Sequence, residues 1–412
     1  MARKSIFPKC EHMKLSMYAN AVFGIWPFIF EDYPTLKKIY DVYCKITLTY
    51  YFLFIVSGWI KFFQLFQEVP IPATEIMGNI SITFIYSVTI WRARAIRGPR
   101  MMNIIKNVID WEKKIMESED QPLIDIFNNY AWQNRIISQV FIITVIIVTN
   151  LFFVHPLGLD PRPRYDPVTN ETVYIKPLPL SSWFPFDDQK HYLRAYMFHI
   201  LDAYVGASFV NNTDLFSFGI ITFPLGQTVI LNYILSHFED YVVKIQEQLG
   251  VERDEASFIT LRECILKHKD IISYIKAFNK EMNIVILLDF LQSSLQLAAI
   301  ALQLIFFEVN LFNFVFSIMF VICMLTRLLG YYWYANEIII ETSNIPLAIW
   351  SSKWYEEPKK TQDMMMIMML KCSRPLTLNI GPFNTMSINT LIGIIKATYS
   401  YMMVVYKGQQ SK

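Results

Sequence analysis

Ionisable side chains inside long apolar stretches are the first candidates for chemistry in this sequence. Asp202, Asp289 and Lys396 each lie within such a stretch. Because burying a charge in a membrane is costly, such groups usually mark a proton relay, an ion pathway or a ligand site. A transporter relay is one hypothesis. For Asp202 and Asp289 we favour another, in which each carboxylate faces a neighbouring helix or a water-filled vestibule, because no glycine-broken helix pair of the transporter type is visible.

Metal and enzyme chemistry is not indicated by the remaining motifs. His191 and His199 lie eight residues apart, but a zinc site normally needs three or four ligands, so we expect interfacial histidines and no metal. The methionine-rich run 363–370 fits a packed helix face better than a copper–thioether site. The sequence carries no GxxxxGK[ST], HExxH or GxSxG motif and no basic cluster with interleaved aromatic residues. We therefore expect no enzyme activity, no cofactor and no nucleic-acid partner.

The composition indicates a membrane protein. Of the 412 residues, 54% are hydrophobic and 17% are charged, whereas soluble chains usually carry about a quarter charged residues. The apolar residues form blocks of about 20, enough to cross a hydrocarbon core of about 30 Å as a helix. We predict an all-α membrane protein with seven transmembrane helices. The expected spans are Tyr43–Phe63, Thr74–Trp91, Ile136–Val154, Tyr196–Thr222, Ile284–Phe307, Leu311–Leu329 and Ile388–Tyr406.

The distribution of basic residues orients these spans. Most of the 37 Lys and Arg residues fall in segments 1–39, 92–135, 236–280 and 327–379. Because short loops rich in Lys and Arg stay in the cytoplasm, we place the N-terminus inside and, after seven spans, the C-terminus outside. This topology is opposite to that of G-protein-coupled receptors and excludes that class.

The same pattern divides the chain into three parts. Residues 1–335 form spans one to six, residues 336–379 belong to a cytoplasmic anchor into which the helices extend, and residues 380–412 form the seventh span and a short outer tail. The long proline-rich loop after span three is expected outside, folded over the mouth of the bundle as a lid. Its sequon Asn170-Glu-Thr is a candidate glycosylation site.

The seventh apolar stretch has one small and polar face. At helical spacing this face presents Gly393, Lys396, Ala397, Ser400, Val404 and Lys407. One such helix cannot enclose a pore, but four symmetry-related copies can, and a ring of Val404 side chains would make a constriction that excludes water. The alternative is a span that packs through its small residues.

Several short motifs follow one another in the last part of the chain. They are Trp354-Tyr355, Arg374-Pro375-Leu376, Phe383, Ser387 and the run Lys-Ala-Thr-Tyr-Ser-Tyr that begins at Lys396. In this order they resemble the C-terminal signature of the insect odorant receptors. Seven spans with an inside N-terminus extend the likeness loosely over the rest of the chain.

The resemblance implies a ligand-gated, nonselective cation channel in the plasma membrane, in the dendrite of a sensory neuron. In this family a variable odorant-tuning subunit joins a shared co-receptor in a heterotetramer, whose seventh helices line one pore. The segment between spans four and five, 236–280, lacks the long insertion of the co-receptor, so the chain resembles a tuning subunit. The implied partners are the co-receptor, a small volatile ligand, membrane lipids and permeating cations.

The resemblance also implies roles for single residues. Val404 aligns with the hydrophobic gate of the pore, and Lys407 replaces a glutamine at its mouth, a departure for a cation channel. The odorant pocket is implied in the outer halves of spans two, three, four and six, where the side chains suit a largely apolar volatile with one hydrogen-bonding group. The candidate contacts, each of which is otherwise ordinary helix packing, are Ile82, Tyr86, Thr144, Leu151, Tyr196, Ile200, Tyr204, Asn313 and Phe316.

Two alternatives remain open. A gustatory-type receptor would be a homomeric channel, but its usual ending of Thr-Tyr, five apolar residues and Gln-Phe is replaced here by Ser400-Tyr401 and Lys407-Gly408. A secondary transporter would use Lys396 and Asp289 and would give flux without a ligand-gated current.

Overall fold

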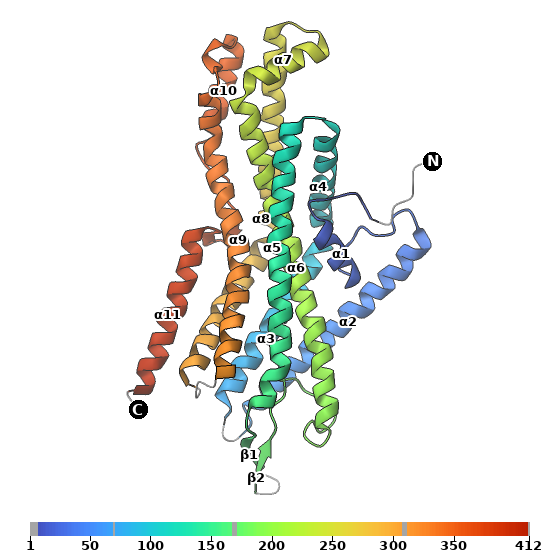
Figure 1. The fold of residues 1–412 in the computed structure, drawn as a ribbon, viewed down its shortest axis with the longest axis vertical. Coiled ribbons are helices and arrows are strands. Elements are labelled where there is room, and N and C mark those ends of the chain that lie inside the picture. The colour runs from blue at the N-terminus through green and yellow to red at the C-terminus, as the bar shows by residue number, and fades with distance from the viewer. Residues whose placement is uncertain (1–6, 69–70, 167–170, 307–310, 411–412) are drawn as a thin grey trace.

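The computed structural model describes residues 7–68, 71–166, 171–306 and 311–410, apart from the side chains of 73–74, 166, 301–313, 401–402 and 404–410. Within these residues the chain is an elongated bundle of long helices (Figure 1). The helices are α1 (Lys14–Val22), α2 (Pro34–Leu65), α3 (Ala73–Ile96), α4 (Pro99–Glu117), α5 (Gln121–Val154), α6 (Tyr192–Ser236), α7 (Phe238–Leu249), α8 (Arg253–Phe306), α9 (Leu311–Ser351), α10 (Lys359–Cys372) and α11 (Ile388–Gln410). Two antiparallel hairpins pair β1 (Arg162–Asp166) with β2 (Glu171–Ile175), and β3 (Asn379–Ile380) with β4 (Asn384–Thr385).

The central helix of the bundle is α6. Its side chains from 211 to 228 are buried on every side, the pattern of a helix enclosed by other helices. Its ladder of backbone hydrogen bonds is interrupted at Pro224, which has no N–H for the carbonyl of Ile220. The hydroxyl of Tyr274 on α8 donates to that carbonyl at 2.8 Å instead. A neighbouring helix therefore satisfies the one acceptor that the proline leaves free.

Five of the described helices are long and apolar enough to cross a membrane, judged by length and composition: α2, α5, α6, α8 and α9. They contain the predicted spans one, three, four and six and, up to Phe306, span five. The predicted second and seventh spans correspond to α3 and α11, which are 24 and 23 residues long. At 1.5 Å per residue each is about 35 Å long. The count of seven spans and their orientation stay predictions.

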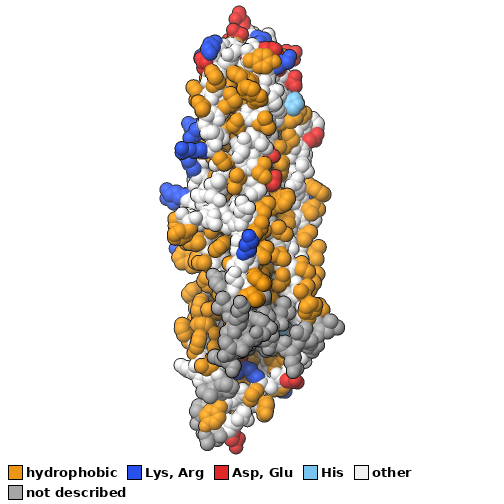
Figure 2. All heavy atoms as spheres, turned by 90° about the vertical axis from the view of Figure 1, so that its left-hand side faces the viewer, with side chains coloured by type: hydrophobic (Ala, Val, Ile, Leu, Met, Phe, Trp, Pro, Cys, Tyr) orange, Lys and Arg blue, Asp and Glu red, His pale blue; other side chains and the backbone are white. Residues whose placement is uncertain are grey.

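The helices run well beyond the predicted spans at one end of the molecule. There α7 and α10 pack with the neighbouring ends of α8 and α9, opposite the β1–β2 hairpin (Figure 1). Met365 and Met368 are buried on α10, whereas Ile367 and Leu370 are exposed, so the methionine-rich run is a packed helix face, as predicted. Charged side chains gather at this end of the visible face, and hydrophobic ones cover much of the remainder (Figure 2).

Four charged side chains meet inside the bundle, and we call them the charge cluster: Arg92 of α3, Asp214 of α6, Asp289 of α8 and Arg327 of α9. Arg327 Nε donates to Asp214 at 2.8 Å, and Arg92 donates to Asp289 at 2.6 Å. Each arginine also pairs with the other aspartate, and the hydroxyl of Tyr331 donates to Asp214 at 2.6 Å. Two positive and two negative charges balance, which offsets the large cost of removing them from water.

Two arginines of the charge cluster begin segments whose basic residues orient the chain. Arg92 and Arg327 start the segments 92–135 and 327–379, and each of these two residues is only 2% exposed. Both pair with carboxylates inside the bundle, a contact that a count of basic residues cannot detect. The hypothesis favoured for the two aspartates agrees with the structure, since Asp289 faces neighbouring helices and Asp202 accepts a hydrogen bond from Tyr50 of α2 at 2.5 Å.

Candidate functional site

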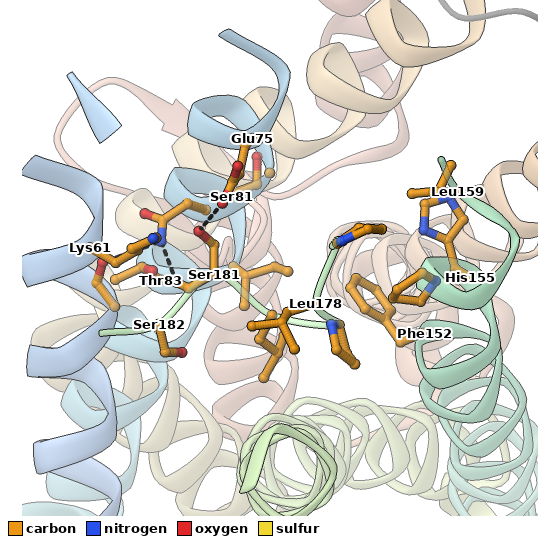
Figure 3. Close-up of a pocket in the computed structure, with 18 of the residues that line it drawn as sticks. Lys61, Glu75, Ser81, Thr83, Phe152, His155, Leu159, Leu178, Ser181 and Ser182 are labelled. Atoms are coloured by element: carbon orange, nitrogen blue, oxygen red, sulfur yellow. Dashed lines mark hydrogen bonds between the residues drawn. The ribbon is translucent and has the colours of Figure 1, made fainter. Parts of the chain in front are cut away.

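A cavity of about 450 Å³ lies in the bundle at the end that carries the β1–β2 hairpin. Its walls come from α2, α3, α8 and α9, from the end of α5 with the 3₁₀ turn His155–Gly158, and from the loop that leads to α6 (Figure 3). The volume falls in the range of small-molecule pockets, roughly 300–1,000 Å³.

The loop between β2 and α6 closes one side of this cavity. Its prolines keep it extended, and Leu178 lies among the lining residues. The loop is tied to two helices through its backbone. Asn79 Nδ2 of α3 donates to the carbonyl of Ser181 at 2.6 Å, and the N–H of Trp183 donates to the carbonyl of Ser57 on α2 at 3.1 Å. This packing agrees with the predicted lid over the bundle.

Ion pairs of the neighbouring strand β1 and a turn ahead of α6 flank this loop. The guanidinium of Arg162 on β1 pairs with Glu68, just after α2, at 2.9 Å and also with Glu75 of α3. Because Glu68 is buried, this pair is screened less by water than a surface pair is. Ahead of α6, the carboxylate of Asp187 accepts the backbone N–H of Lys190, and this hydrogen bond holds the pKa of Asp187 below its usual range.

One side of the cavity is polar, and the other is mainly apolar but also carries His155. Ser81, Thr83 and Ser181 lie on one side in Figure 3, and Phe152 and Leu159 lie across from them. The polar side is built by α2, α3 and the loop, and the opposite side by the end of α5 and its turn, with aromatic residues of α9 adding to the lining. Such an arrangement suits a small molecule with a hydrocarbon body and a polar end.

Three of the nine predicted odorant contacts line the cavity: Ile82, Tyr86 and Phe316. Five others are described in the structure but are not part of the lining: Thr144, Leu151, Tyr196, Ile200 and Tyr204. The side chain of Asn313 lies outside the described residues. Whether any of the nine touches a ligand stays a prediction.

The N-terminal part of α6 contacts α5 through Tyr196 and Tyr204, and neither of these residues lines the cavity. The hydroxyl of Tyr204 donates to the Asn150 amide oxygen on α5 at 2.9 Å, and the hydroxyl of Tyr196 donates to the carbonyl of Phe153. Thr144 uses its hydroxyl within α5, on the carbonyl of Phe141 at 2.8 Å. From the sequence we did not expect α2, α8 and the loop to line the cavity. Two amide side chains within apolar helices, Asn79 and Gln296, could have indicated where the cavity lies.

The predicted pore face of α11 is exposed where the structure describes it. Gly393, Lys396 and Ser400 are exposed and Ala397 is partly buried, whereas Leu391 and Ile394 are buried where α11 contacts α8 and α9. Val404, Lys407 and the sequon residue Asn170 lie outside the described side chains. The hydroxyl of Ser400 donates to the carbonyl of Lys396 at 3.0 Å, so this polar group is satisfied within the helix.

Among the described residues, no group of three or more His, Cys, Asp and Glu side chains is arranged to hold a metal ion. His199 is buried against the ring of Phe184, with ring centroids 4.9 Å apart. His191 is exposed near the ring of Phe186. The two histidines therefore make aromatic contacts at the start of α6.

Comparison with known proteins gives one consistent family. A family model described as 7tm Odorant receptor matches residues 73–399. Odorant receptor 10 of Aedes albopictus is 21% identical over 306 residues, which are 74% of this chain and 76% of that protein. The odorant receptor coreceptor of Aedes aegypti is 22% identical over 140 residues, only 34% of this chain and 29% of that protein. The longer match to a receptor than to a coreceptor favours an odorant-tuning subunit.

The fold is also found among solved structures. The olfactory receptor OR5 from Machilis hrabei, in complex with eugenol, matches with a TM-score of 0.75 and 13% identity over 96% of this chain and 97% of that chain. At this identity the likeness shows the fold alone. Since the family model covers well over half of the sequence, the chain belongs to the insect odorant receptor family, whose members are multi-pass membrane proteins that act as odorant-gated ion channels and not as enzymes.

Proposed function

We propose that this chain is the odorant-tuning subunit of a heteromeric, nonselective cation channel in the plasma membrane. A small volatile binds in the cavity between α2, α3, α8, α9 and the loop, and its binding favours the open state of a pore shared with the co-receptor. The observation that carries this proposal is the cavity of about 450 Å³ with one polar and one mainly apolar wall. The Machilis hrabei receptor, which has the same fold, was solved in complex with eugenol.

The exposed face of α11 supports the assignment of the pore. Leu391 and Ile394 attach this helix to its own bundle, while Gly393, Lys396 and Ser400 face outward. Four subunits around one axis would turn these small and polar faces toward a common aqueous path. With seven spans and the N-terminus inside, the C-terminal end of α11 then lies at the outer mouth of the pore. Membrane lipids contact the exposed apolar residues of the other helices.

Expression in oocytes, with and without a co-receptor, tests the proposal. We expect volatile-evoked, nonselective cation currents from the pair and none from either chain alone, because the pore needs both kinds of subunit. The measurement is two-electrode voltage clamp with a panel of volatiles, together with surface labelling of each chain. Robust current from this chain alone would instead indicate a homomeric channel, and ligand-independent flux would indicate a transporter.

Replacing Val404 with alanine should raise the resting conductance of the heteromer severalfold. A ring of Val404 side chains makes the closed pore narrow and apolar enough to exclude water. The loss of two methyl groups from each substituted subunit widens the ring and weakens that barrier. The measurement is the holding current without ligand, normalised to surface expression. Val405→Ala is the matched control, because the next residue points about 100° away on a helix. An unchanged resting conductance in Val404→Ala counts against this gate.

A further inference from the structure

We propose that the amide oxygen of Asn79 accepts a hydrogen bond from the bound ligand. The receptor would then select volatiles that carry a neutral O–H group, alcohols or phenols, over ethers of the same shape. This inference rests on the proposed function, because it requires the described cavity to be the odorant site.

The hydrogen bonds of Asn79 fix which way its amide points. Nδ2 donates to the carbonyl of Ser181 at 2.6 Å and to the carbonyl of Gly58 at 3.2 Å. Both partners are acceptors only, so the amide nitrogen must face them. The opposite assignment would set the amide oxygen against two carbonyl oxygens. Oδ1 is therefore directed away from the loop–α2 contact that Nδ2 makes.

That oxygen is a buried acceptor with no donor among the described residues. The Asn79 side chain is only 3% exposed and belongs to the lining of the cavity. A buried acceptor without a hydrogen bond is unfavourable, because it has lost water and gained no partner. Because Oδ1 has almost no accessible surface, the side chains that cover it must shift to admit a ligand O–H group, which then restores the missing bond. An ether oxygen has only lone pairs and would face Oδ1 without any attraction.

Two neighbouring hydroxyls on the polar wall are already engaged. The hydroxyl of Ser81 donates to the carbonyl of Met77 at 2.7 Å, and the hydroxyl of Ser181 donates to Glu75 at 3.0 Å. The ammonium group of Lys61 lies 3.9 Å from the carboxylate of Glu68, an ion pair without a hydrogen bond. No described donor bonds to Asn79 Oδ1, so a ligand hydroxyl would supply the missing bond. Because an amide oxygen carries no proton, it also disfavours a carboxylate ligand at this point.

The two walls define how such a ligand would lie. Its hydroxyl is directed to Asn79 on α3, and its hydrocarbon part extends toward Phe152 at the end of α5 and toward Phe316 and Phe320 of α9. Figure 3 shows Phe152 on the side of the cavity opposite the polar residues of α3 and the loop. Buried hydroxyl recognition discriminates more strongly than the fit of a hydrocarbon chain, since an unpaired polar group is left when the hydroxyl is missing.

Matched pairs of ligands test this inference on the intact receptor with its co-receptor. The probes are 4-ethylphenol against 4-ethylanisole and 1-octanol against 1-methoxyheptane. In the wild type we expect the hydroxyl member of each active pair to have a half-maximal concentration at least tenfold lower than its ether. Equal half-maximal concentrations within active pairs overturn the inference, whatever happens in the variants.

A variant assigns the selectivity to Asn79. Asn79→Leu also loses the hydrogen bonds of Nδ2 to Ser181 and Gly58 and can shift the response to both members of a pair, so the readout is the ratio within a pair. This hydroxyl preference should fall to threefold or less. Phe152→Leu is the matched control, since it changes the apolar wall and should shift both members of a pair alike. Surface labelling identifies a variant that fails to fold, in which case Asn79→Ala replaces Asn79→Leu. A preserved tenfold preference in a surface-expressed Asn79 variant contradicts the assignment.

Failure of the inference is distinguishable from failure of the proposed function. A receptor pair that gives volatile-evoked currents without hydroxyl selectivity keeps the function and loses the role of Asn79. A pair that reaches the cell surface and gives no current to any volatile loses both.

Discussion

Replacing Asp214 with alanine should prevent most of the receptor from reaching the cell surface. Asp214 is fully buried and, like Asp289, contacts both Arg92 and Arg327 in the charge cluster. Its loss leaves two guanidinium groups sharing Asp289. Removing one partner of a buried ion pair typically costs about 3–5 kcal/mol. That is a large part of a total stability of about 5–15 kcal/mol. Surface biotinylation and thermal unfolding in detergent give the measurement.

Asp363→Ala is the matched control for this prediction. Asp363 on α10 pairs with Lys359 at 3.0 Å, and its side chain is 51% exposed. Exposed pairs contribute about 0–1 kcal/mol, so this variant should be expressed like the wild type. The double variant Asp214→Leu with Arg327→Leu restores the charge balance and should recover part of the lost stability. A double variant less stable than Asp214→Ala would show that charge balance is not the decisive term.

Replacing Gly206 with valine should reduce the response to bulky volatiles and destabilise the bundle. A Cβ atom at Gly206 of α6 would lie 2.6 Å from Cζ of Tyr86 on α3, closer than real contacts allow. Tyr86 is buried between Tyr51 and Phe54 and also lines the cavity. Its ring is therefore pushed toward the cavity or the helices separate. Overpacking of this kind costs about 1–3 kcal/mol. Dose–response curves for ligands of increasing size, with thermal unfolding, measure both effects.

A glycine without close neighbours provides the comparison. A Cβ atom at Gly78 of α3 would meet nothing within 4 Å. Gly78→Ala should therefore be neutral or stabilising by up to about 1 kcal/mol, because alanine favours the helix. Combining Gly206→Val with Tyr86→Leu should restore the thermal stability lost in Gly206→Val, because the smaller side chain at position 86 makes room. If Gly206→Val behaves like the wild type in both assays, the contact between α3 and α6 is looser than described.

The class of protein could be read from the sequence because the bilayer sets a simple length rule. Apolar blocks of about 20 residues predict helices, and the five described helices that are long and apolar enough to cross a membrane contain predicted spans. The ends of these helices were harder to predict. The predicted span that starts at Ile284 covers only the second part of α8, which begins at Arg253, because a helix continues beyond its apolar stretch wherever neighbouring helices pack against it.

The cavity was harder to predict, for a geometric reason. The position of a residue along a helix follows from the sequence, and it placed Ile82, Tyr86 and Phe316 at the right depth. The direction of a side chain around the helix axis depends on which neighbours the helix packs against. Tyr196 and Tyr204 have suitable depth but face α5. Arg92 and Arg327 raise the same problem, since only the packing of four helices brings them to Asp214 and Asp289.

The charge cluster and the cavity share α3, α8 and α9 but lie about two helical turns apart on each of them. No member of the cluster belongs to the cavity lining. Substitutions in the lining therefore leave the balance of the charge cluster untouched. Under the proposed function, ligand preference can then drift in a gene duplicate while the four charges that hold α3, α6, α8 and α9 together stay the same. This separation makes the receptor readily evolvable.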